Sequence, residues 1–372
     1  MADEEIDFAA AGLLDGLEGT DREDRLVLLR QLSSEGFALD HLRRTSESGT
    51  VVFLPAERVI GGAQRYTAAQ AAELSGIKLD FLLASRRAMG LPIPDPDETA
   101  FTEADVDAAR RAKLAREAGI SDEDLLELLR VLGRGLAQAA ETMRALPLKL
   151  VLRAGISESE LAFHYGEAVA RLYPLVDPML SNLLAAHLRH ASASEVISAV
   201  ERTGGRLPGS REVAVCFADL VGFTRLGEEL PPDELGRLAT RLEAIAYDVA
   251  GPPVRLVKTI GDAAMLAAPE PEPLLDAALA LIDAAEAEGG EFPELRAGAA
   301  LGMAVPSAGD WFGQPVNLAS RITAIARPGS LLVDRELREA AGSGFRVSSA
   351  GQRRLRGIRE PVPLFRVRRA EA

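Results

Sequence analysis

The sequence has few of the residues that disulfides, metal clusters or membrane spans require. Its 372 residues include one cysteine, Cys216, which lies inside an apolar run. An intrachain disulfide is therefore impossible, and a cysteine-based zinc cluster is excluded. No run of about 18 uncharged apolar residues occurs, which argues against a transmembrane helix. Residues 1–7 are acidic where a signal peptide would be basic. These absences predict a soluble, cytoplasmic protein.

Aromatic residues and positive charge are also scarce. Aromatics make up 5% of the chain, but hydrophobic residues reach 47%, which is enough for ordinary cores and excludes global disorder. The chain has 42 basic and 56 acidic residues, a net charge of −14. This acidity argues against broad nucleic-acid binding, which needs clustered Lys and Arg. At about 100–200 residues per domain, the length indicates two or three domains.

Lysine is the rarer of the two basic residues. Only four of the 42 are lysine, and Lys258 is the sole one after residue 149. A GC-rich genome accounts for the preference for arginine. Against this background Lys258 is informative, because it lies inside the densest motif of the sequence.

Residues 1–203 are predicted to form a helical domain. Four helix starts carry a capping-box pattern, in which a hydroxyl and an acidic or amide side chain three residues later satisfy first-turn amides. The pairs are Thr67 with Gln70, Thr102 with Asp105, Ser121 with Asp124, and Ser157 with Glu160. Apolar residues then follow at helical spacing, as in Leu125, Leu128, Leu129 and Leu132.

Prolines and glycines punctuate this helical half. Pro92, Pro94 and Pro96 indicate a loop between two helical groups. A last helix is expected to begin with Asp177 as cap and Pro178 in the first turn, and to run to Val200 or beyond. Residues 204–211, rich in glycine, are the predicted linker.

After residue 211 the pattern changes to alternating strands and helices. Strands are expected at 213–218, 254–257, 263–267, 295–305, 331–333 and 345–347, and helices near 232–249, 273–288, 315–326 and 334–341. This alternation predicts one α/β domain over 212–368. Split at residue 200, the charge is −11 before and −3 after. The less acidic half suits an anionic substrate better.

Two aspartates of this half stand where strands end. Asp219 follows the apolar run 213–218, and Asp262 follows Lys258-Thr-Ile-Gly. A buried aspartate is costly unless a cation or donor compensates it. Two on adjacent strands can hold a pair of Mg²⁺ ions for in-line attack at phosphorus. A lone Asp-x-x-Gly, however, is mostly a turn signal.

Two further elements suit phosphate chemistry. The turn at 220–224 opens into a helix and offers backbone amides to phosphate oxygens. In the segment 309–321, Pro315 opens a helix on which Asn317 and Arg321 are i and i+4 and share one face. Such an arginine can place a fixed charge on a pentavalent phosphate. Alternatively, the Asn/Arg pair is simply a solvated helix face.

Together these segments resemble the class III nucleotidyl cyclase catalytic domain over about residues 210–368. The resemblance rests on Phe-Ala-Asp-Leu-Val-Gly-Phe-Thr at 217–224, Val-Lys-Thr-Ile-Gly-Asp at 257–262 and Gly-Gln-Pro-Val-Asn-Leu-Ala-Ser-Arg at 313–321. It implies a ferredoxin-like α+β fold that works as a head-to-tail homodimer, with active sites at the interface. It also implies an adenylyl or guanylyl cyclase with two Mg²⁺ or Mn²⁺ ions in each site.

The same resemblance implies a role for each motif residue. The metal site would comprise Asp219, Leu220 and Asp262, and the phosphate-binding turn would be Gly222, Phe223 and Thr224. Lys258 and Asp310 would read the purine. Asn317 and Arg321 would stabilise the transition state. In a homodimer, the metal aspartates would come from one subunit and the other four residues from its partner. One position departs from the family pattern, because Arg356 stands where many members have a triphosphate-binding lysine. The surrounding basic segment, 351–372, is alternatively a solvated edge.

The purine-reading pair favours ATP. Adenine presents an acceptor at N1 and a donor at its 6-amino group, which match a donor-only lysine and an acceptor-only carboxylate. Guanine reverses both polarities, so Lys258 and Asp310 disfavour a guanylyl cyclase. The leading prediction is therefore an adenylyl cyclase that makes cyclic AMP and pyrophosphate.

The helical half resembles the regulatory, autoinhibitory domains of soluble bacterial adenylyl cyclases. Residues 66–77 also look like the start of a MerR-type helix-turn-helix motif, which leaves a nucleotide-sensing transcription regulator as the alternative. A half at net −11 is a poor duplex binder, so nucleic acid is an unlikely partner. His187 and His190 are i and i+3 on the last helix. They are either ordinary surface residues or a pair whose protonation shifts this helix.

Overall fold

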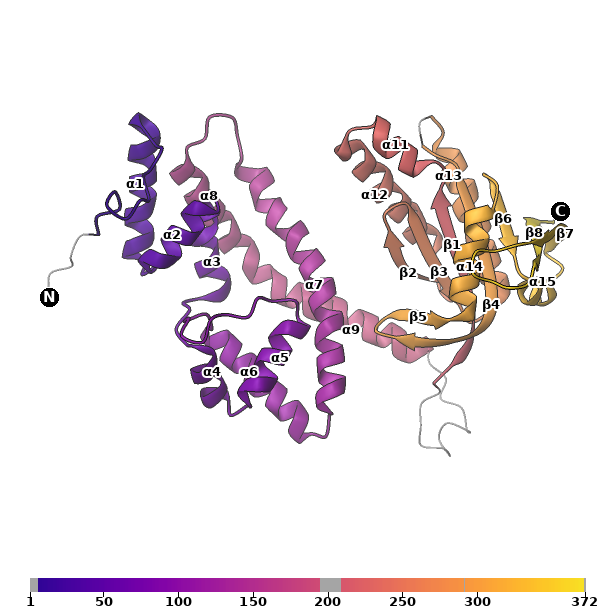
Figure 1. The fold of residues 1–372 in the computed structure, drawn as a ribbon, viewed down its shortest axis with the longest axis horizontal. Coiled ribbons are helices and arrows are strands. Elements are labelled where there is room, and N and C mark those ends of the chain that lie inside the picture. Colours follow the sequence, from indigo (N-terminus) through magenta and orange to yellow (C-terminus); the bar gives the residue numbers. More distant parts are fainter. Residues whose placement is uncertain (1–5, 195–208, 291, 371–372) are drawn as a thin grey trace. The chain divides into compact units, whose positions relative to one another are not determined.

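The chain divides into two compact units. The computed structural model describes residues 6–194, 209–290 and 292–370. One unit, Met1–Ser192, is helical, and the other, Ala193–Ala372, is α/β (Figure 1). No helix within the described ranges is long and apolar enough to cross a membrane. The end of the last helix beyond residue 194 and residues 204–208 of the predicted linker lie outside the described residues.

Helices make up most of the N-terminal unit within residues 6–192, together with one isolated β-bridge between Tyr66 and Phe101. They are α1 (Gly19–Ser34), α2 (Leu39–Glu47), α3 (Leu54–Gly61), α4 (Ala68–Ser75), α5 (Leu79–Ala88), α6 (Glu103–Glu117), α7 (Asp122–Val151), α8 (Glu158–Leu172) and α9 (Val176–Ser194), with short 3-10 turns at Val51–Phe53 and Tyr173–Leu175. The loop expected around Pro92, Pro94 and Pro96 joins α5 to α6. The prediction of a helical first half is confirmed.

Two of the four expected capping boxes form completely. At the starts of α4 and α6, Thr67 and Thr102 make the reciprocal pair of bonds. Ser121 and Ser157 accept their N3 amides, but their hydroxyls donate to carboxylates, Asp124 at 2.6 Å and Asp24 at 2.8 Å. At these two helix starts each hydroxyl is therefore bonded to a carboxylate, and the return bond from the N3 side chain to the backbone of the cap residue is not formed.

One expectation for the helical unit is wrong in detail. Asp177 does not cap the last helix, because the chain passes from the 3-10 turn Tyr173–Leu175 directly into α9 at Val176, so no extended cap residue is needed. The leucines of α7 do not all face a core: Leu125 is buried, but Leu128 and Leu132 are 52% and 38% exposed. Helical periodicity identified the helix but not what covers it.

One sheet organises the C-terminal unit. Its strands are β1 (Arg211–Leu220), β2 (Arg255–Ile260), β3 (Ala263–Ala268), β4 (Leu295–Ser307), β5 (Asp310–Gly313), β6 (Ser330–Val333), β7 (Phe345–Arg353) and β8 (Val362–Arg369). Their order is β2-β3-β1-β4-β6-β8-β7, with β5 paired to β4. Among the strand pairs that the structure describes, β4–β6 alone is parallel. The predicted α/β fold is confirmed, although β5 and β8 were not anticipated.

Helices cover both faces of this sheet (Figure 1). They are α11 (Phe223–Glu229), α12 (Pro232–Val249), α13 (Pro271–Glu288), α14 (Gln314–Ile325) and α15 (Arg335–Ala340). One apolar core joins α12, α13 and α15 to one face of the sheet, and a second joins α14 to the other. The helix expected to carry Asn317 and Arg321 therefore packs alone on its face, among the described elements.

A glycine lets α14 lie unusually close to the sheet. A Cβ built on Gly298 of β4 would lie 2.3 Å from the backbone nitrogen of Thr323. The hydroxyl of Thr323 lies 2.8 Å from the carbonyl of Ala319 and 3.1 Å from that of Phe217 in β1. Because no side chain separates the two backbones at Gly298, α14 is held at a fixed height above β1 and β4.

We predict that Gly298→Ala forces α14 away from the sheet and destabilises the protein by about 1–3 kcal/mol, since the added methyl has no space. Thermal unfolding measures this effect. Gly302→Ala is the matched control on the same strand, because its Cβ would meet Pro315 at an ordinary 3.6 Å. Equal stability of the two variants would contradict this account of the packing.

A buried carboxylate links β6, α15 and β4. Asp334 is 1% exposed and accepts hydrogen bonds from Leu337 N at 2.9 Å and Leu301 N at 3.3 Å. Burial raises the pKa of Asp334 to about 7, although the two backbone donors oppose that shift. At neutral pH this side chain is therefore close to its titration midpoint.

The raised pKa of Asp334 predicts a stability that falls as pH rises. Between about pH 4 and 7 the folded carboxyl keeps a proton that the unfolded one has released, so raising the pH favours unfolding. Unfolding temperatures measured from pH 5 to 8 should fall less steeply for Asp334→Asn, which does not titrate. Parallel curves for the two proteins would show that this carboxyl does not contribute the pH dependence.

Candidate active site

The two candidate metal aspartates lie side by side. Strands β1 and β3 are antiparallel neighbours, and their register sets Asp219 opposite Ala263. Leu220 N donates to the carbonyl of Asp262 at 2.9 Å, which brings the β2–β3 turn to the end of β1. Burial raises the pKa of the Asp262 carboxyl, and the neighbouring charge of Asp219 raises it further. Two like charges in contact at a partly buried site are a destabilised arrangement that a cation would relieve.

An arginine that the sequence analysis missed completes this group. Arg296 of β4 pairs with Asp219 across the sheet, and its Nε and Nη2 lie 2.9 and 2.5 Å from Asp219 Oδ2. The same guanidinium opposes the rise in the pKa of Asp262. A single arginine at the start of an apolar strand is a weak signal, and only the strand register reveals its partner. Arg296 thus offsets part of the negative charge of the aspartate pair through one oxygen of Asp219.

The donor set fits a hard divalent cation that also binds substrate. Asp219 and Asp262 offer carboxylate oxygens, whereas Leu220 is 1% exposed and can contribute only its backbone carbonyl. Within the described ranges no group of three or more His, Cys, Asp or Glu residues is arranged to hold a metal. Mg²⁺ is typically bound by one or two carboxylates together with substrate phosphates and water. The two aspartates therefore suit Mg²⁺ or Mn²⁺ in a substrate complex better than a permanently closed metal cage.

The turn after β1 presents backbone amides beside the aspartates. Gly222 adopts a left-handed conformation, with φ of 78°, and α11 begins at Phe223. The first amides of a helix have no carbonyl partner inside it, so they can donate to an anion. The Phe223 side chain packs against the core, while Thr224 is exposed. Phe223 can therefore act through its backbone rather than its ring.

The purine-reading residues also meet. Lys258 Nζ of β2 forms an ion pair with Asp310 Oδ2 of β5, and Trp311 N donates to Asp310 Oδ1 at 2.8 Å. The two residues are 52 positions apart in sequence. The structure thus places a donor-only and an acceptor-only side chain at one point, oriented by a backbone amide.

The α14 helix carries the remaining motif residues. Asn317 is exposed, and Arg321 is half-buried on the same face. A Cβ on Gly357, whose φ is 75°, would lie 3.4 Å from Arg321 Nη2, so the β7–β8 loop containing Arg356 runs beside this guanidinium. No hydrogen bond or ion pair recorded among the described residues joins Asp219 or Asp262 to these α14 residues or to the Lys258–Asp310 pair. We call the aspartate pair, and the Lys258–Asp310 pair with its neighbouring α14 residues, the two candidate half-sites of the chain.

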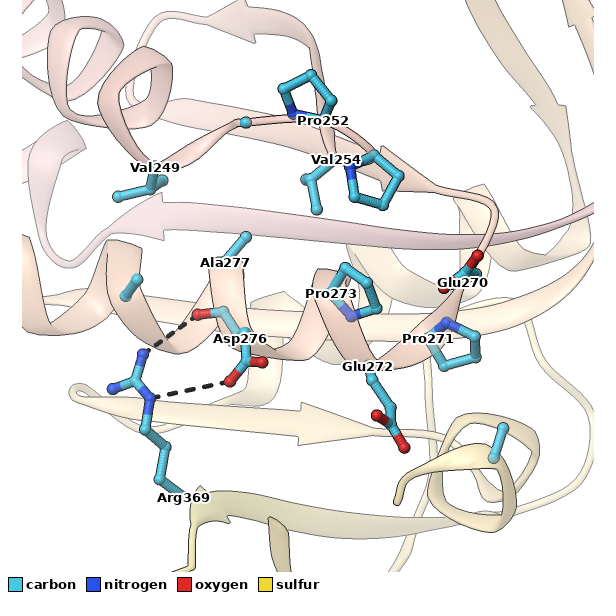
Figure 2. Close-up of a pocket in the computed structure, with 14 residues that line it drawn as sticks. Val249, Pro252, Val254, Glu270, Pro271, Glu272, Pro273, Asp276, Ala277 and Arg369 are labelled. Atoms are coloured by element: carbon cyan, nitrogen blue, oxygen red, sulfur yellow. Dashed lines mark hydrogen bonds and ion pairs between the residues drawn. The ribbon is translucent and has the colours of Figure 1, made fainter. Parts of the chain in front are cut away.

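The remaining candidates lie elsewhere. His187 and His190 are exposed on α9, in the helical unit. A cavity of about 830 Å³ opens between the α12–β2 connection and the start of α13, at the opposite end of the β2–β3 hairpin from Asp262 (Figure 2). Its arginine, Arg369, is already paired with Asp276 and Asp283. This cavity is not part of either half-site.

Comparison with known proteins places the chain in a family. Residues 6–192 match the adenylate cyclase regulatory domain. The chain is 45% identical over 365 residues to the pH-sensitive adenylate cyclase of Mycobacterium tuberculosis, covering 96% of this chain and 91% of that protein. It is 34% identical over 299 residues to the adenylate cyclase of Streptomyces griseus, covering 80% and 73%.

Among solved structures, the guanylate cyclase domain of RhGC from Catenaria anguillulae, in complex with GTP, is 22% identical. That comparison covers 44% of this chain and 100% of the solved one, with a TM-score of 0.39. The family is decided by the sequence relatives and by the regulatory-domain match, which together span both units. This chain belongs to the class III adenylyl cyclases that carry an N-terminal adenylate cyclase regulatory domain.

Proposed function

We propose that this protein converts ATP to 3′,5′-cyclic AMP and pyrophosphate by two-metal catalysis at a homodimer interface. The observation that carries the proposal is the contact between the Asp219 and Asp262 carboxylates at the end of β1. Side-by-side carboxylates next to a turn with free helix amides are suited to a metal-bound triphosphate.

In this mechanism Asp219 and Asp262 would hold two Mg²⁺ or Mn²⁺ ions, and the Leu220 carbonyl would be a further oxygen ligand. When bound, such ions neutralise phosphate charge and lower the pKa of the ribose 3′-hydroxyl. The amides of Gly222, Phe223 and Thr224 bind the phosphates. The ribose 3′-hydroxyl gives its proton to solvent, its oxygen forms the bond to the α-phosphorus, and the bond from the α-phosphorus to the bridging oxygen breaks, so that pyrophosphate leaves. No side chain is assigned as the general base.

Charge that develops at the α-phosphorus is stabilised from α14. Arg321 presents a permanently charged fork, and Asn317, one turn earlier, orients it or the ribose. Arg356, on the loop that passes beside Arg321, binds the triphosphate. Because α14 is fixed to the sheet at Gly298, these groups are positioned before the substrate arrives.

Adenine is read by Lys258 and Asp310. In this structure the two side chains contact each other, so both are held at the same point of the site. Lys258 can donate to N1 and Asp310 can accept from the 6-amino group, whereas guanine would leave both mispaired. This polarity favours ATP over GTP.

A homodimer would bring the two kinds of half-site together. One chain carries both the aspartate pair and the Lys258/α14 group, without a recorded bond between them. Apolar side chains are also exposed at the β4–β5 hairpin, where Met303, Val305 and Phe312 are 56%, 42% and 58% exposed. Burial of such a patch between two copies would stabilise a homodimer.

The helical unit is proposed to regulate this activity. The Mycobacterium tuberculosis relative of this chain is named a pH-sensitive adenylate cyclase. His187 and His190 lie one turn apart on α9. We propose that their protonation adds positive charge to this helix and alters assembly of the active sites.

The α4–α5 pair serves as packing scaffold rather than as a DNA reader, because Arg86 of α5 stacks on Phe101 and donates to Pro92 O.

A mixing experiment tests both the activity and the dimer. With ATP and Mg²⁺ or Mn²⁺, Asp262→Asn and Arg321→Ala should each lose about 100-fold or more of cyclic AMP formation. Co-expressed in equal amounts, they should recover about a quarter of wild-type activity, because half of the dimers carry one intact site. GTP should be a poor substrate for the wild-type protein. A mixture as inactive as its components would contradict the shared site.

Divalent cations should stabilise the folded protein through the aspartate pair. We expect millimolar Mn²⁺ to raise the unfolding temperature of the wild-type chain but not that of Asp262→Asn, since binding to the folded state shifts the equilibrium. Asp248→Asn, which removes an exposed carboxylate near the end of α12, should respond like the wild type. An equal shift in all three proteins would place the ions elsewhere.

The histidine hypothesis predicts a difference between pH profiles. The full chain should show a pH-dependent transition in activity that the His187→Ala/His190→Ala variant lacks. His164→Ala, in α8, is the matched control. Cyclic AMP formation between pH 5.5 and 8 measures the effect. Superimposable profiles for all of these proteins would remove these two histidines from the regulation.

A further inference from the structure

A cavity of about 590 Å³ lies on the α14 face of the sheet, beyond the end of that helix. Its wall includes Ile325, which is four residues after Arg321 and so one turn further along α14. The polar residues that line it include Arg327, Arg353, Arg354, Arg366, Ser348 and Ser349. No acidic residue is among its lining, so the cavity is strongly positive.

These arginines have not been neutralised by the protein itself. No ion pair recorded among the described residues involves Arg327, Arg353, Arg354 or Arg366. The Nε of Arg366 is buried and has no hydrogen-bond partner within the described part of the chain. A buried donor without an acceptor is costly, and guanidiniums that share a cavity repel one another. An anion in the cavity would remove both penalties.

The strand pairing explains why the arginines gather here. Arg366 of β8 lies between Leu332 of β6 and Ser348 of β7, which are its register partners on either side. Leu332 and Leu364 belong to the core under α14, so the alternation of β8 points Arg366 to this same face. Arg353 and Arg354 follow at the end of β7.

We infer that this cavity binds an inorganic diphosphate or longer phosphate chain, at a site separate from the metal aspartates and from Lys258 and Asp310. Guanidinium forks and hydroxyls are the donors that phosphate oxygens take, and Ser348, the register partner of Arg366 on β7, lies on the same face of the sheet as that arginine. The cavity volume lies within the range of small-ligand pockets, about 300–1,000 Å³.

The lining also limits what the ligand can be. No aromatic ring, carboxylate or side-chain amide borders the cavity to stack on a base or read its edge. The site therefore selects phosphate groups rather than a nucleoside. The same diphosphate chemistry occurs in free pyrophosphate and in the tail of a nucleotide. The inference does not require cyclase activity, although the proposed reaction would release pyrophosphate one helical turn away.

Calorimetric titration of the full chain with sodium pyrophosphate in EDTA tests this inference, because removal of divalent ions eliminates metal-dependent phosphate binding. Arg321→Ala should still bind. Arg327→Ala/Arg353→Ala, which changes two exposed side chains, should bind about ten-fold or more weakly. Arg335→Ala is the control, since it removes an exposed arginine from α15 on the opposite face. Arg366→Lys, which keeps the charge but loses the Nε donor, should also weaken binding.

Two outcomes support the site and two overturn it. Displacement of pyrophosphate by metal-free ATP would identify a nucleotide tail as a second source of the ligand, and failure of ATP to compete would identify the free anion. Absence of pyrophosphate binding by the wild-type chain would overturn the inference. Equal affinity of Arg327→Ala/Arg353→Ala and Arg335→Ala would also overturn it, and circular dichroism of each variant checks that the fold is retained.

Discussion

The candidate active site depends on the strand register that brings Asp219 and Asp262 together at one end of the sheet. Asp219 and Asp262 are in contact at a partly buried strand end, and Arg296 from the next strand is the cation that this chain supplies against them. The β-sheet register enforces this proximity, because Asp219 faces Ala263 on one side and Arg296 on the other. The free energy of folding therefore keeps the Asp219 and Asp262 carboxylates close together, although like charges would move apart in an unfolded chain.

The fixed height of α14 is the second constraint. At Gly298 the helix backbone lies against β4 with no side chain between them, and Thr323 makes hydrogen bonds to the adjoining carbonyls. This contact holds α14 in one position on the sheet. Asn317, Arg321 and the wall of the arginine-lined cavity therefore keep fixed positions relative to one another. Both of the phosphate sites proposed for this chain therefore depend on the same packing contact.

Charge is distributed unevenly between the two units in a way that fits their proposed roles. The helical unit is strongly acidic, while the α/β unit concentrates guanidiniums on one face, at Arg321, Arg356 and the 590 Å³ cavity. A phosphate-rich substrate and product would be attracted to that face and not to the regulatory unit. Among the described residues, the α/β unit thus has the positively charged surface that phosphate ligands require.

Local patterns in the sequence determined the helical first half, most strands of the second, and the motifs that identify the family, because these depend on periodicity, caps and short segments. The strand β5, only four residues long, and β8, with alternating arginines, carry too weak a local signal to be found. The pairing of Asp219 with Arg296, the exposed leucines of α7 and the unpaired Nε of Arg366 were decided by tertiary structure. Each depends on which strand or helix lies alongside, and that neighbour is set by packing between segments far apart in the chain.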